Sequence, residues 1–251
     1  MATDRRPLRR IGVAVLLTLA GVVLSVLLSL PALLVSLGAL AGFVALTVLG
    51  ELGFAVAALG FVSVTRRGVD FLDLRAPTLR ALGVVVLGTV GMFVFRIVAL
   101  VAVQALGLPV AGNAITEYPG VDLASILLVL IPVSVIVVGP SEELLFRGVV
   151  QRYLSEGFAE STAILLTGAL FSMVHLPTTV AADANPLAVV VTLVLLFGLS
   201  LVLSYLYVWT DNLAVPILVH GLYDASIFAL AYLAVSLQKL PTVAGILLAV
   251  R

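Results

Sequence analysis

Long apolar segments recur along the whole chain, and they constrain the fold more than any other feature. Residues 11–30 and 187–209, for example, contain no charged side chain and are long enough to cross the roughly 30 Å hydrocarbon core of a bilayer. Only 10% of the 251 residues are charged, whereas about a quarter are charged in a soluble domain. The segments also lack the polar alternation of transmembrane β-strands. The sequence therefore predicts an all-α, polytopic transmembrane helix bundle with about seven to eight helices.

Seven segments have the length of a membrane-spanning helix. Their predicted ranges are Ile11–Leu30, Ala32–Val64, Ala81–Leu106, Leu123–Leu154, Thr162–Leu176, Leu187–Trp209 and Leu213–Leu237. We expect three parts in the chain. Residues 1–122 hold the first three helices and a loop, residues 123–237 hold the last four helices, and residues 238–251 form a C-terminal tail too short to span a membrane.

Charged residues concentrate in the connecting segments and predict the orientation. The N-terminal segment and residues 65–80 are rich in arginine, whereas residues 107–122 and 178–186 contain no Lys or Arg. By the positive-inside rule the N-terminus and the loop at 65–80 are cytoplasmic. An arginine-rich N-terminus without a transit pattern favours a prokaryotic cell membrane. The 13 basic residues balance 13 acidic ones, so the bilayer is the expected partner and nucleic acid is not.

Eight ionisable side chains fall within the predicted helices, where an ionisable group is costly and faces a partner or a cavity. They are Glu51, Arg96, Glu142, Glu143, Arg147, His175, His220 and Asp224. Glu51 and Arg96 lie at similar distances from the loop that joins the second and third helices. We therefore predict that they form a structural ion pair outside the catalytic site.

Glu142 and His175 fall at similar depth on the fourth and fifth helices. The loop between these helices is centred near residue 158, about 16 residues after Glu142 and about 17 before His175, so a straight hairpin places both within about 2 Å in depth. His220 lies about 12 Å above the linker at Asn212, also in the cytoplasmic half. Phe146 and Phe171 are level by the same rule. We expect three helices to bring Glu142, His175 and His220 together around a polar cavity.

Residue spacing within the helices supports this cavity. Glu143 and Arg147 are four residues apart, share a helix face and can pair, and His220 and Asp224 have the same spacing. Gly139-Pro140 predicts a break or kink in the fourth helix. Within lipid such a break is tolerated only against protein or a water-filled cavity.

The break would also affect the two glutamates. Ser141 is expected to cap the part of the helix that follows Pro140. Glu142 and Glu143 would then lie in a first helical turn, where the positive end of the helix dipole favours carboxylates.

This set of side chains suits the hydrolysis of an amide bond by activated water. A carboxylate can accept the proton of water, a histidine can share that water or hold a metal, and a second histidine can stabilise an oxyanion. Other intramembrane protease designs fit poorly, because the sequences H-E-x-x-H, G-x-G-D and G-x-S-G are absent. The chain has no cysteine, which excludes a disulfide framework, a thiol nucleophile and cysteine-ligated metal sites.

Three short motifs follow one another on separate helices. Glu142–Arg147 reads E-E-x-x-x-R, Phe171–His175 reads F-x-x-x-H, and His220–Asp224 reads H-x-x-x-D. In this order they resemble the CPBP family of CAAX proteases and bacteriocin-processing enzymes, also called the Abi family, which includes the type II CAAX prenyl endopeptidases. The resemblance covers about residues 123–237, which makes this segment the predicted catalytic core. The third motif of the family usually ends in Asn, and Asp224 departs from that.

The resemblance implies an intramembrane endopeptidase that acts on a membrane-anchored peptide or protein, with prenylated CAAX proteins as one option. It implies that Glu142 is the general base and shares the water with His175. Glu143 and Arg147 would form a supporting pair. His220 and Asp224 would orient the water or stabilise the oxyanion. If one divalent metal such as zinc is used, the implied ligands are Glu142, His175 and His220.

Two other functions remain open on the sequence alone. A protein of the same fold could be a non-catalytic immunity or scaffold protein. Buried carboxylates and histidines also relay protons in proton-coupled transporters. Transporters often have two related halves with broken helices, and this chain has one Gly-Pro break next to acidic residues.

Overall fold

The structure is a computed structural model that describes residues 6–112 and 118–238, and in this part of the chain it contains helices and no strands. In chain order the helices are α1 (Arg6–Leu34), α2 (Ala39–Thr65), η1 (Val69–Leu72), α3 (Leu79–Ala105), α4 (Leu123–Val133), η3 (Ser134–Val138), α5 (Gly139–Glu143), η4 (Leu144–Gln151), α6 (Arg152–Ser155), α7 (Glu160–Val174), α8 (Leu176–Ala182), α9 (Pro186–Thr210) and α10 (Ala214–Gln238). The prediction of an all-α bundle is confirmed. The predicted C-terminal tail lies outside the described residues beyond Gln238.

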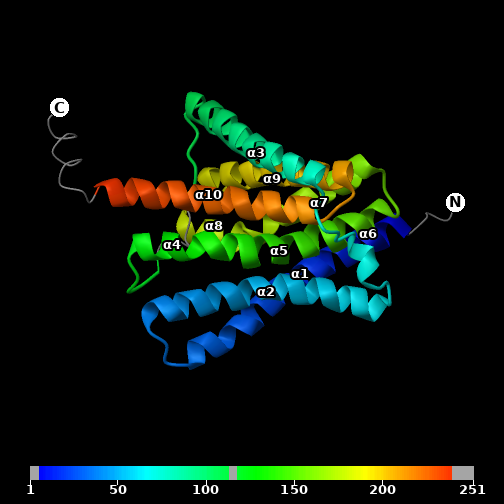
Figure 1. Cartoon of the computed structure of the whole chain (residues 1–251), viewed down its shortest axis with the longest axis horizontal. Helices are drawn as coiled ribbons and strands as arrows, with labels where there is room; N and C mark the ends of the chain where they lie inside the picture. Colours follow the sequence, from blue (N-terminus) through cyan, green and yellow to red (C-terminus); the bar gives the residue numbers. More distant parts are fainter. Residues whose placement is uncertain (1–5, 113–117, 239–251) are drawn as a thin grey trace.

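Within the described residues, six helices are long and apolar enough to cross a membrane. The bent pair α7–α8 makes a seventh if it counts as one span. The long helices run along the long axis of the molecule, side by side (Figure 1). Their outward-facing side chains include many exposed leucines and valines. The chain is therefore an integral membrane protein built as a polytopic helix bundle.

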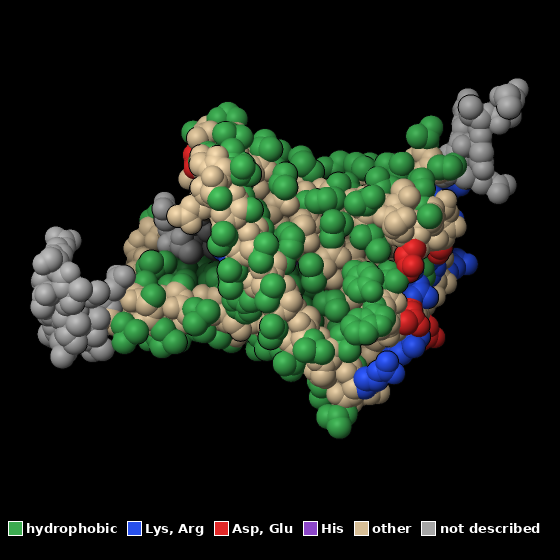
Figure 2. All heavy atoms as spheres, turned by 90° about the horizontal axis from the view of Figure 1, so that it is seen from above, with side chains coloured by type: hydrophobic (Ala, Val, Ile, Leu, Met, Phe, Trp, Pro, Cys, Tyr) green, Lys and Arg blue, Asp and Glu red, His purple; other side chains and the backbone are tan. Residues whose placement is uncertain are grey.

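Charged side chains gather at one end of this bundle. Figure 2 shows hydrophobic side chains over the middle of the visible face, and acidic and basic side chains near the end where α1 begins. At this end Glu156 forms ion pairs with Arg10 and Arg67. Asp73 pairs there with Arg75 and Arg152. These contacts tie the start of α1, the loop after α2 and the turn after α6 into one polar rim.

A low pH should weaken the ion pairs of Glu156 in this rim. Hydrogen bonds from Arg67 and Arg10 hold the pKa of the Glu156 carboxyl below its ordinary value. A carboxyl whose pKa is depressed by folding contributes stability above its unfolded pKa, and that stability is lost as the pH falls through the folded pKa. Because the group is partly exposed, we expect Glu156→Gln to lower stability by only about 0.2–1 kcal/mol at pH 7. Thermal unfolding in detergent should show this difference from wild type shrinking toward pH 4. A difference that stays constant with pH would contradict this account.

The first two helices are separated at a different place from the one predicted. The sequence predicted a break at Leu30-Pro31, but α1 continues through Pro31 to Leu34, and α2 begins at Ala39. Pro31 lies near the C-terminal end of the helix. Its missing backbone N–H removes only one hydrogen bond there. The two helices pack tightly, because a Cβ on Gly53 would meet the backbone nitrogen of Ser25 at 2.2 Å.

The predicted interruption at Gly139-Pro140 is wrong. Residues 123–155 form one continuous helical span, with π-helical turns at η3 and η4 around α5. The Gly139 N–H bonds to the carbonyl of Ser134, so the wider turn passes the chain through Pro140 without a break. Ser141 is buried inside this span and caps no helix.

The fifth predicted helix ends two residues early. Its range, Thr162–Leu176, corresponds to α7, which ends at Val174, and a bend of 42° leads into α8. The predicted range stops just before Pro177, but this proline lies in the first turn of α8, where a missing N–H costs nothing. His175 therefore sits at the bend, and residues predicted as a loop after it are helical.

The third helix packs away from the second. Figure 1 places α2 and α3 on opposite sides of the bundle, with α5 and α10 between them. Helix α3 contacts α9 and α10. The loop of residues 66–78 carries the chain across the charged end. It is fastened there because the Leu213 N–H donates to the Asp73 carbonyl and the Arg75 N–H donates to the Asn212 side chain.

Candidate active site

Glu142, His175 and His220 lie together inside the bundle. One carboxylate oxygen of Glu142 is 4.0 Å from Nε2 of His175, and the other is 3.9 Å from Nε2 of His220. Glu142 is 5% exposed and His220 is 6% exposed. Phe146 also contacts Phe171, with ring centroids 5.0 Å apart. The structure thus brings together the three side chains that helix depth predicted to be level.

The ring of His175 has a defined orientation. Its Nδ1 is 2.9 Å from the backbone carbonyl oxygen of Phe171. A carbonyl oxygen only accepts, so Nδ1 carries a proton, and in the neutral ring Nε2 then presents its lone pair toward Glu142. The separation of 4.0 Å is too long for a direct hydrogen bond. A space of this width between two acceptors suits a water molecule that donates to both.

Glu143 forms the centre of a buried network. Its Oε1 accepts from Arg147 Nη1 at 2.7 Å and lies 2.8 Å from His220 Nδ1. Glu143 and Arg147 are both completely buried. The i,i+4 pair predicted from the sequence is therefore present, and it also fixes the ring of His220 through Nδ1.

The network reaches two further helices. Arg147 Nη2 donates to the backbone carbonyl of Ser200 at 2.9 Å and to its hydroxyl at 2.6 Å. The guanidinium also lies over the ring of Phe171, 4.9 Å from its centroid. One arginine thus connects η4 with α9, α7 and, through Glu143, with α10. Sequence reasoning missed Ser200.

A signal for Ser200 was present in the sequence. Ser200 and Ser204 are four residues apart in an otherwise apolar helix, and both are completely buried. Their partners Arg147 and Gln151 have the same spacing, and the Gln151 amide donates to the Ser204 carbonyl. Matched polar residues at equal spacing on two apolar helices indicate that the helices pack side by side.

Asp224 completes the surroundings of His220. Its Oδ2 is 3.3 Å from Nε2 of His220, while Glu143 faces Nδ1 of the same ring. A proton on each ring nitrogen makes both contacts attractive, so this position suits an imidazolium cation. Such a cation is a hydrogen-bond donor aimed at the same space as Glu142.

The predicted ion pair between Glu51 and Arg96 is wrong. Within the described residues, Arg96 donates to the hydroxyl of Tyr223 at 3.4 Å. Glu51 instead lies close enough to Glu142, His220 and Asp224 for their charges to interact. The predicted ion pair does not form because a long loop separates α2 from α3 and the two helices do not pack together. Glu51 therefore adds a carboxylate beside the site, although its depth alone predicted a different partner.

Two glycines bring α5 and α10 into close contact. A Cβ on Gly139 would meet the Ile217 carbonyl oxygen at 2.8 Å. A Cβ on Gly221 would meet the Val135 Cα at 2.8 Å and the Ser134 carbonyl oxygen at 2.9 Å. These are backbone atoms that cannot rotate away. The close approach places His220, next to Gly221, within reach of Glu143.

Gly221→Ala should therefore separate the helices and weaken the site. Overpacking against backbone costs about 1–3 kcal/mol of stability. We expect that loss in thermal unfolding, together with a fall in any hydrolytic activity of about 10- to 100-fold, because a displacement near 1 Å at a catalytic group costs that much. Gly91→Ala on α3 is the matched control, since a Cβ there has no neighbour within 4 Å. Equal behaviour of the two variants would show that the contact does not position His220.

The three side chains that the resemblance implies as metal ligands are Glu142 and the two histidines whose Nε2 atoms lie 4.0 Å and 3.9 Å from its carboxylate oxygens. Among the described residues, no group of three or more His, Cys, Asp or Glu side chains has the arrangement of a metal site. Nδ1 of His220 faces Glu143, and Nε2 of the same ring lies 3.3 Å from Asp224 and 3.9 Å from Glu142. A zinc ion held by Glu142, His175 and His220 stays a prediction of the family resemblance.

The comparisons with known proteins agree with the motifs. Residues 124–226 match the sequence model of the family described as Type II CAAX prenyl endopeptidase Rce1-like. No curated protein and no solved structure matches the chain. The matched segment begins in α4, ends in α10 and contains Glu142, Glu143, Arg147, His175, His220 and Asp224. This match supports assigning residues 124–226 to the CPBP family of CAAX-type membrane proteases.

Proposed function

We propose that this protein is an intramembrane endopeptidase that hydrolyses a peptide bond with a water molecule activated by Glu142 and His175. The observation that carries the proposal is the gap of 4.0 Å between the Glu142 carboxylate and Nε2 of His175, whose Nδ1 lies 2.9 Å from the backbone carbonyl oxygen of Phe171. Both groups are acceptors, and both face this gap inside a helix bundle. The family match supports a protease of the CAAX type.

Glu142, His175 and His220 each have a separate role in the reaction. Water in the gap donates its protons to Glu142 and His175, and Glu142 takes one proton as the oxygen attacks the peptide carbonyl carbon. The carbonyl oxygen becomes an oxyanion that accepts from the Nε2 proton of His220. When the C–N bond breaks, Glu142 returns its proton to the leaving amine. The products are one new carboxyl group and one new amino group.

Glu143, Arg147 and Asp224 act through His220. The Glu143–Arg147 pair holds Nδ1 of His220, which fixes the ring plane. Asp224 lies beside Nε2 at 3.3 Å and keeps that nitrogen protonated in the resting site. Asn, which is usual at this position in the family, would fix the ring without adding a charge. An Asp there strengthens the imidazolium as a donor to the oxyanion.

We infer that the substrate is a peptide or protein anchored in the same membrane, with prenylated CAAX-type chains as one class. We place the protein in a prokaryotic cell membrane with its arginine-rich end in the cytoplasm, following the positive-inside rule. Arg10, Arg67, Arg75 and Arg152 all lie at that end. The substrate's reacting segment would then approach from within the bilayer rather than from a soluble domain.

The test is a cleavage assay with purified protein in liposomes. Substrates are lipid-anchored peptides, with and without a prenylated cysteine near the C-terminus, and mass spectrometry identifies the products. We expect cleavage by wild type and none by His175→Ala. Undiminished cleavage by that variant would reject the assignment of the water site. Proton-dependent uptake of a solute without cleavage of any peptide would favour a transporter instead.

A further inference from the structure

Ser200 on α9 is a completely buried polar residue to which the proposed reaction assigns no role. Arg147 Nη2 donates to its hydroxyl at 2.6 Å and to its backbone carbonyl oxygen at 2.9 Å. Arg147 is also completely buried, and a buried cation needs good hydrogen-bond geometry to offset the loss of its hydration. Two acceptors on one residue of a separate helix therefore fix where the guanidinium lies relative to α9.

The guanidinium in turn fixes the ring of His220. Arg147 Nη1 donates to Glu143 Oε1 at 2.7 Å, and the same oxygen lies 2.8 Å from His220 Nδ1. Three short contacts thus lead from the Ser200 hydroxyl to the His220 ring, and all of them lie in the buried interior. Hydrogen bonds to charged groups are short and strong in such surroundings. A displacement of Arg147 should therefore move the ring that donates to the oxyanion.

The flat face of the same guanidinium reaches the other histidine through Phe171. The guanidinium carbon of Arg147 lies 4.9 Å from the centroid of the Phe171 ring, which is a favourable cation–π contact. The centroid of the Phe171 ring lies 5.0 Å from that of His175 and 5.9 Å from that of His220. The backbone carbonyl of Phe171 also faces His175 Nδ1 at 2.9 Å. Arg147 therefore supports both histidines, one through Glu143 and one through Phe171.

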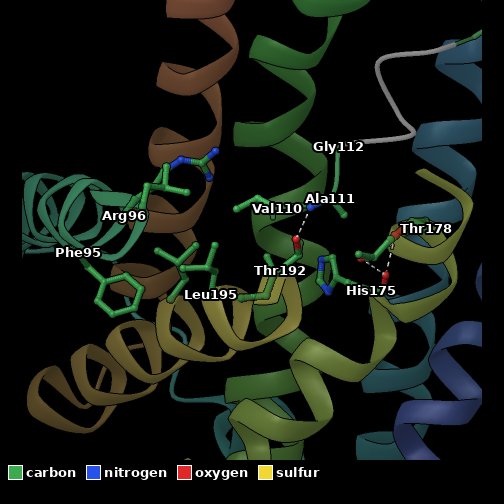
Figure 3. A pocket seen from close by; sticks show the side chains of 13 residues that line it. Phe95, Arg96, Val110, Ala111, Gly112, His175, Thr178, Thr192 and Leu195 are labelled. Atoms are coloured by element: carbon green, nitrogen blue, oxygen red, sulfur yellow. Dashed lines mark hydrogen bonds between the residues drawn. The ribbon is translucent and has the colours of Figure 1, made fainter. Parts of the chain in front are cut away.

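His175 depends on this support because its ring is open on another side. It borders a cavity of about 360 Å³, whose other lining residues come from α3, α8, α9 and residues 110–112. Figure 3 shows the His175 side chain among the residues that line this cavity, and 28% of the side chain is exposed. Because packing is incomplete on the cavity side, the contacts with Phe171 set the orientation of the ring.

We propose that Ser200 is a positioning residue, which anchors Arg147 and thereby holds the two histidines in the relative positions that hydrolysis requires. The proposal rests on the proposed peptidase function and adds to it a residue that acts only through Arg147. Without the Ser200 hydroxyl, one N–H of Arg147 Nη2 is left unpaired in a buried position, which is costly. The guanidinium then gains by shifting toward another acceptor, and both histidines follow it.

The test compares two substitutions on α9. Ser200→Ala removes the hydroxyl that accepts from Arg147. Ser204→Ala is the matched control, because Ser204 is equally buried four residues later, while its own hydroxyl has no hydrogen-bond partner among the described residues. The Gln151 amide bonds to the Ser204 backbone carbonyl, which the substitution keeps. Thermal unfolding in detergent verifies that both variants fold. If Ser200→Ala does not fold, Ser200→Cys takes its place, since it offers only a weak acceptor in a side chain of similar shape.

Ser200→Ala should lower kcat for cleavage of a lipid-anchored peptide by about 5- to 50-fold and change KM by less than about 2-fold, because a displaced oxyanion donor weakens binding of the transition state alone. Ser204→Ala should keep both values within about 2-fold of wild type. In an Arg147→Met background, Ser200→Ala should change kcat by less than about 2-fold, since residues that act as a unit are non-additive. Equal losses in the two serine variants, a loss carried by KM, or a full loss that persists without Arg147 would overturn the proposal.

NMR of the histidine rings separates failure of this proposal from failure of the peptidase assignment. The chain has only two histidines, so ¹⁵N-labelled imidazole gives signals that can be assigned with His175→Ala protein. In substrate-free protein, Ser200→Ala should shift the Nδ1 signal of His220, and Ser204→Ala should leave it unchanged. That result in protein that cleaves no peptide would support the positioning role and reject only the reaction. An unchanged His220 signal in Ser200→Ala would overturn the proposal even if wild type is an active peptidase.

Discussion

Glu142→Gln should lower kcat for peptide cleavage by about 100- to 10,000-fold, with little change in KM, because the amide cannot accept the proton of water. The substitution keeps the size of the side chain and removes a charge that is buried beside two histidines. The fold should therefore persist, and thermal unfolding in detergent can verify this. The measurement is single-turnover cleavage of a lipid-anchored peptide in liposomes.

Glu160→Gln is the matched control for this experiment. Glu160 is an exposed carboxylate in the first turn of α7, outside the site. The control variant should cleave like wild type. If Glu142→Gln retained full activity, or if both variants lost the same amount, Glu142 would not be the group that activates water.

Arg147→Met should lower stability more than Glu156→Gln at the polar rim or Gly221→Ala at the helix contact. It removes the partner of Glu143 and leaves a carboxylate without its strongest donor in a fully buried position. Breaking one side of a buried ion pair costs about 3–5 kcal/mol. Chemical denaturation in detergent micelles should show this loss, and cleavage should fall as well, because the orientation of His220 depends on Glu143.

A double variant separates charge from packing. Glu143→Gln with Arg147→Met removes both charges and should be more stable than Arg147→Met alone, because no unpaired buried charge remains. Arg80→Met is the control for loss of an exposed arginine and should change stability by less than about 0.5 kcal/mol. A double variant that is less stable than the single one would show that Glu143 is stabilised by His220 without help from Arg147.

The site could be predicted from the sequence where the chain connects neighbouring helices by a short turn. Only residues 156–159 separate α6 from α7, so the two helices must pack against each other, and equal depth placed Glu142 opposite His175. Spacing of four residues placed Glu143 with Arg147 in the same way. Both arguments use only helix geometry. They are dependable here because the strongly apolar sequence identifies these segments as helices.

The same arithmetic failed where the connection is long. Residues 66–78 separate α2 from α3 and cross the charged end of the bundle, so equal depth did not bring Glu51 to Arg96. Depth says nothing about which helices are neighbours. The order of helices around the bundle follows instead from contacts such as that of Gly221 with η3 and of Ser200 with Arg147, which sequence patterns alone do not reveal.

The positions at which helices end, bend or widen could not be predicted from the sequence either. Pro140 and Pro177 both indicated helix ends, yet the chain passes Pro140 through a π-helical turn and begins α8 around Pro177. A proline shows that one backbone donor is missing, and the surrounding packing decides whether the helix ends, bends or widens. The bend that does occur lies at His175, where the ring is turned toward Glu142.

The central claim is that Glu142 and His175 act on the same water molecule. A double-mutant cycle tests it most directly, by single-turnover cleavage with wild type, Glu142→Gln, His175→Ala and the double variant. Groups that act as a unit are strongly non-additive. The double variant should therefore be no slower than the worse of the two single variants. Losses that multiply, or undiminished cleavage by either single variant, would contradict a shared water.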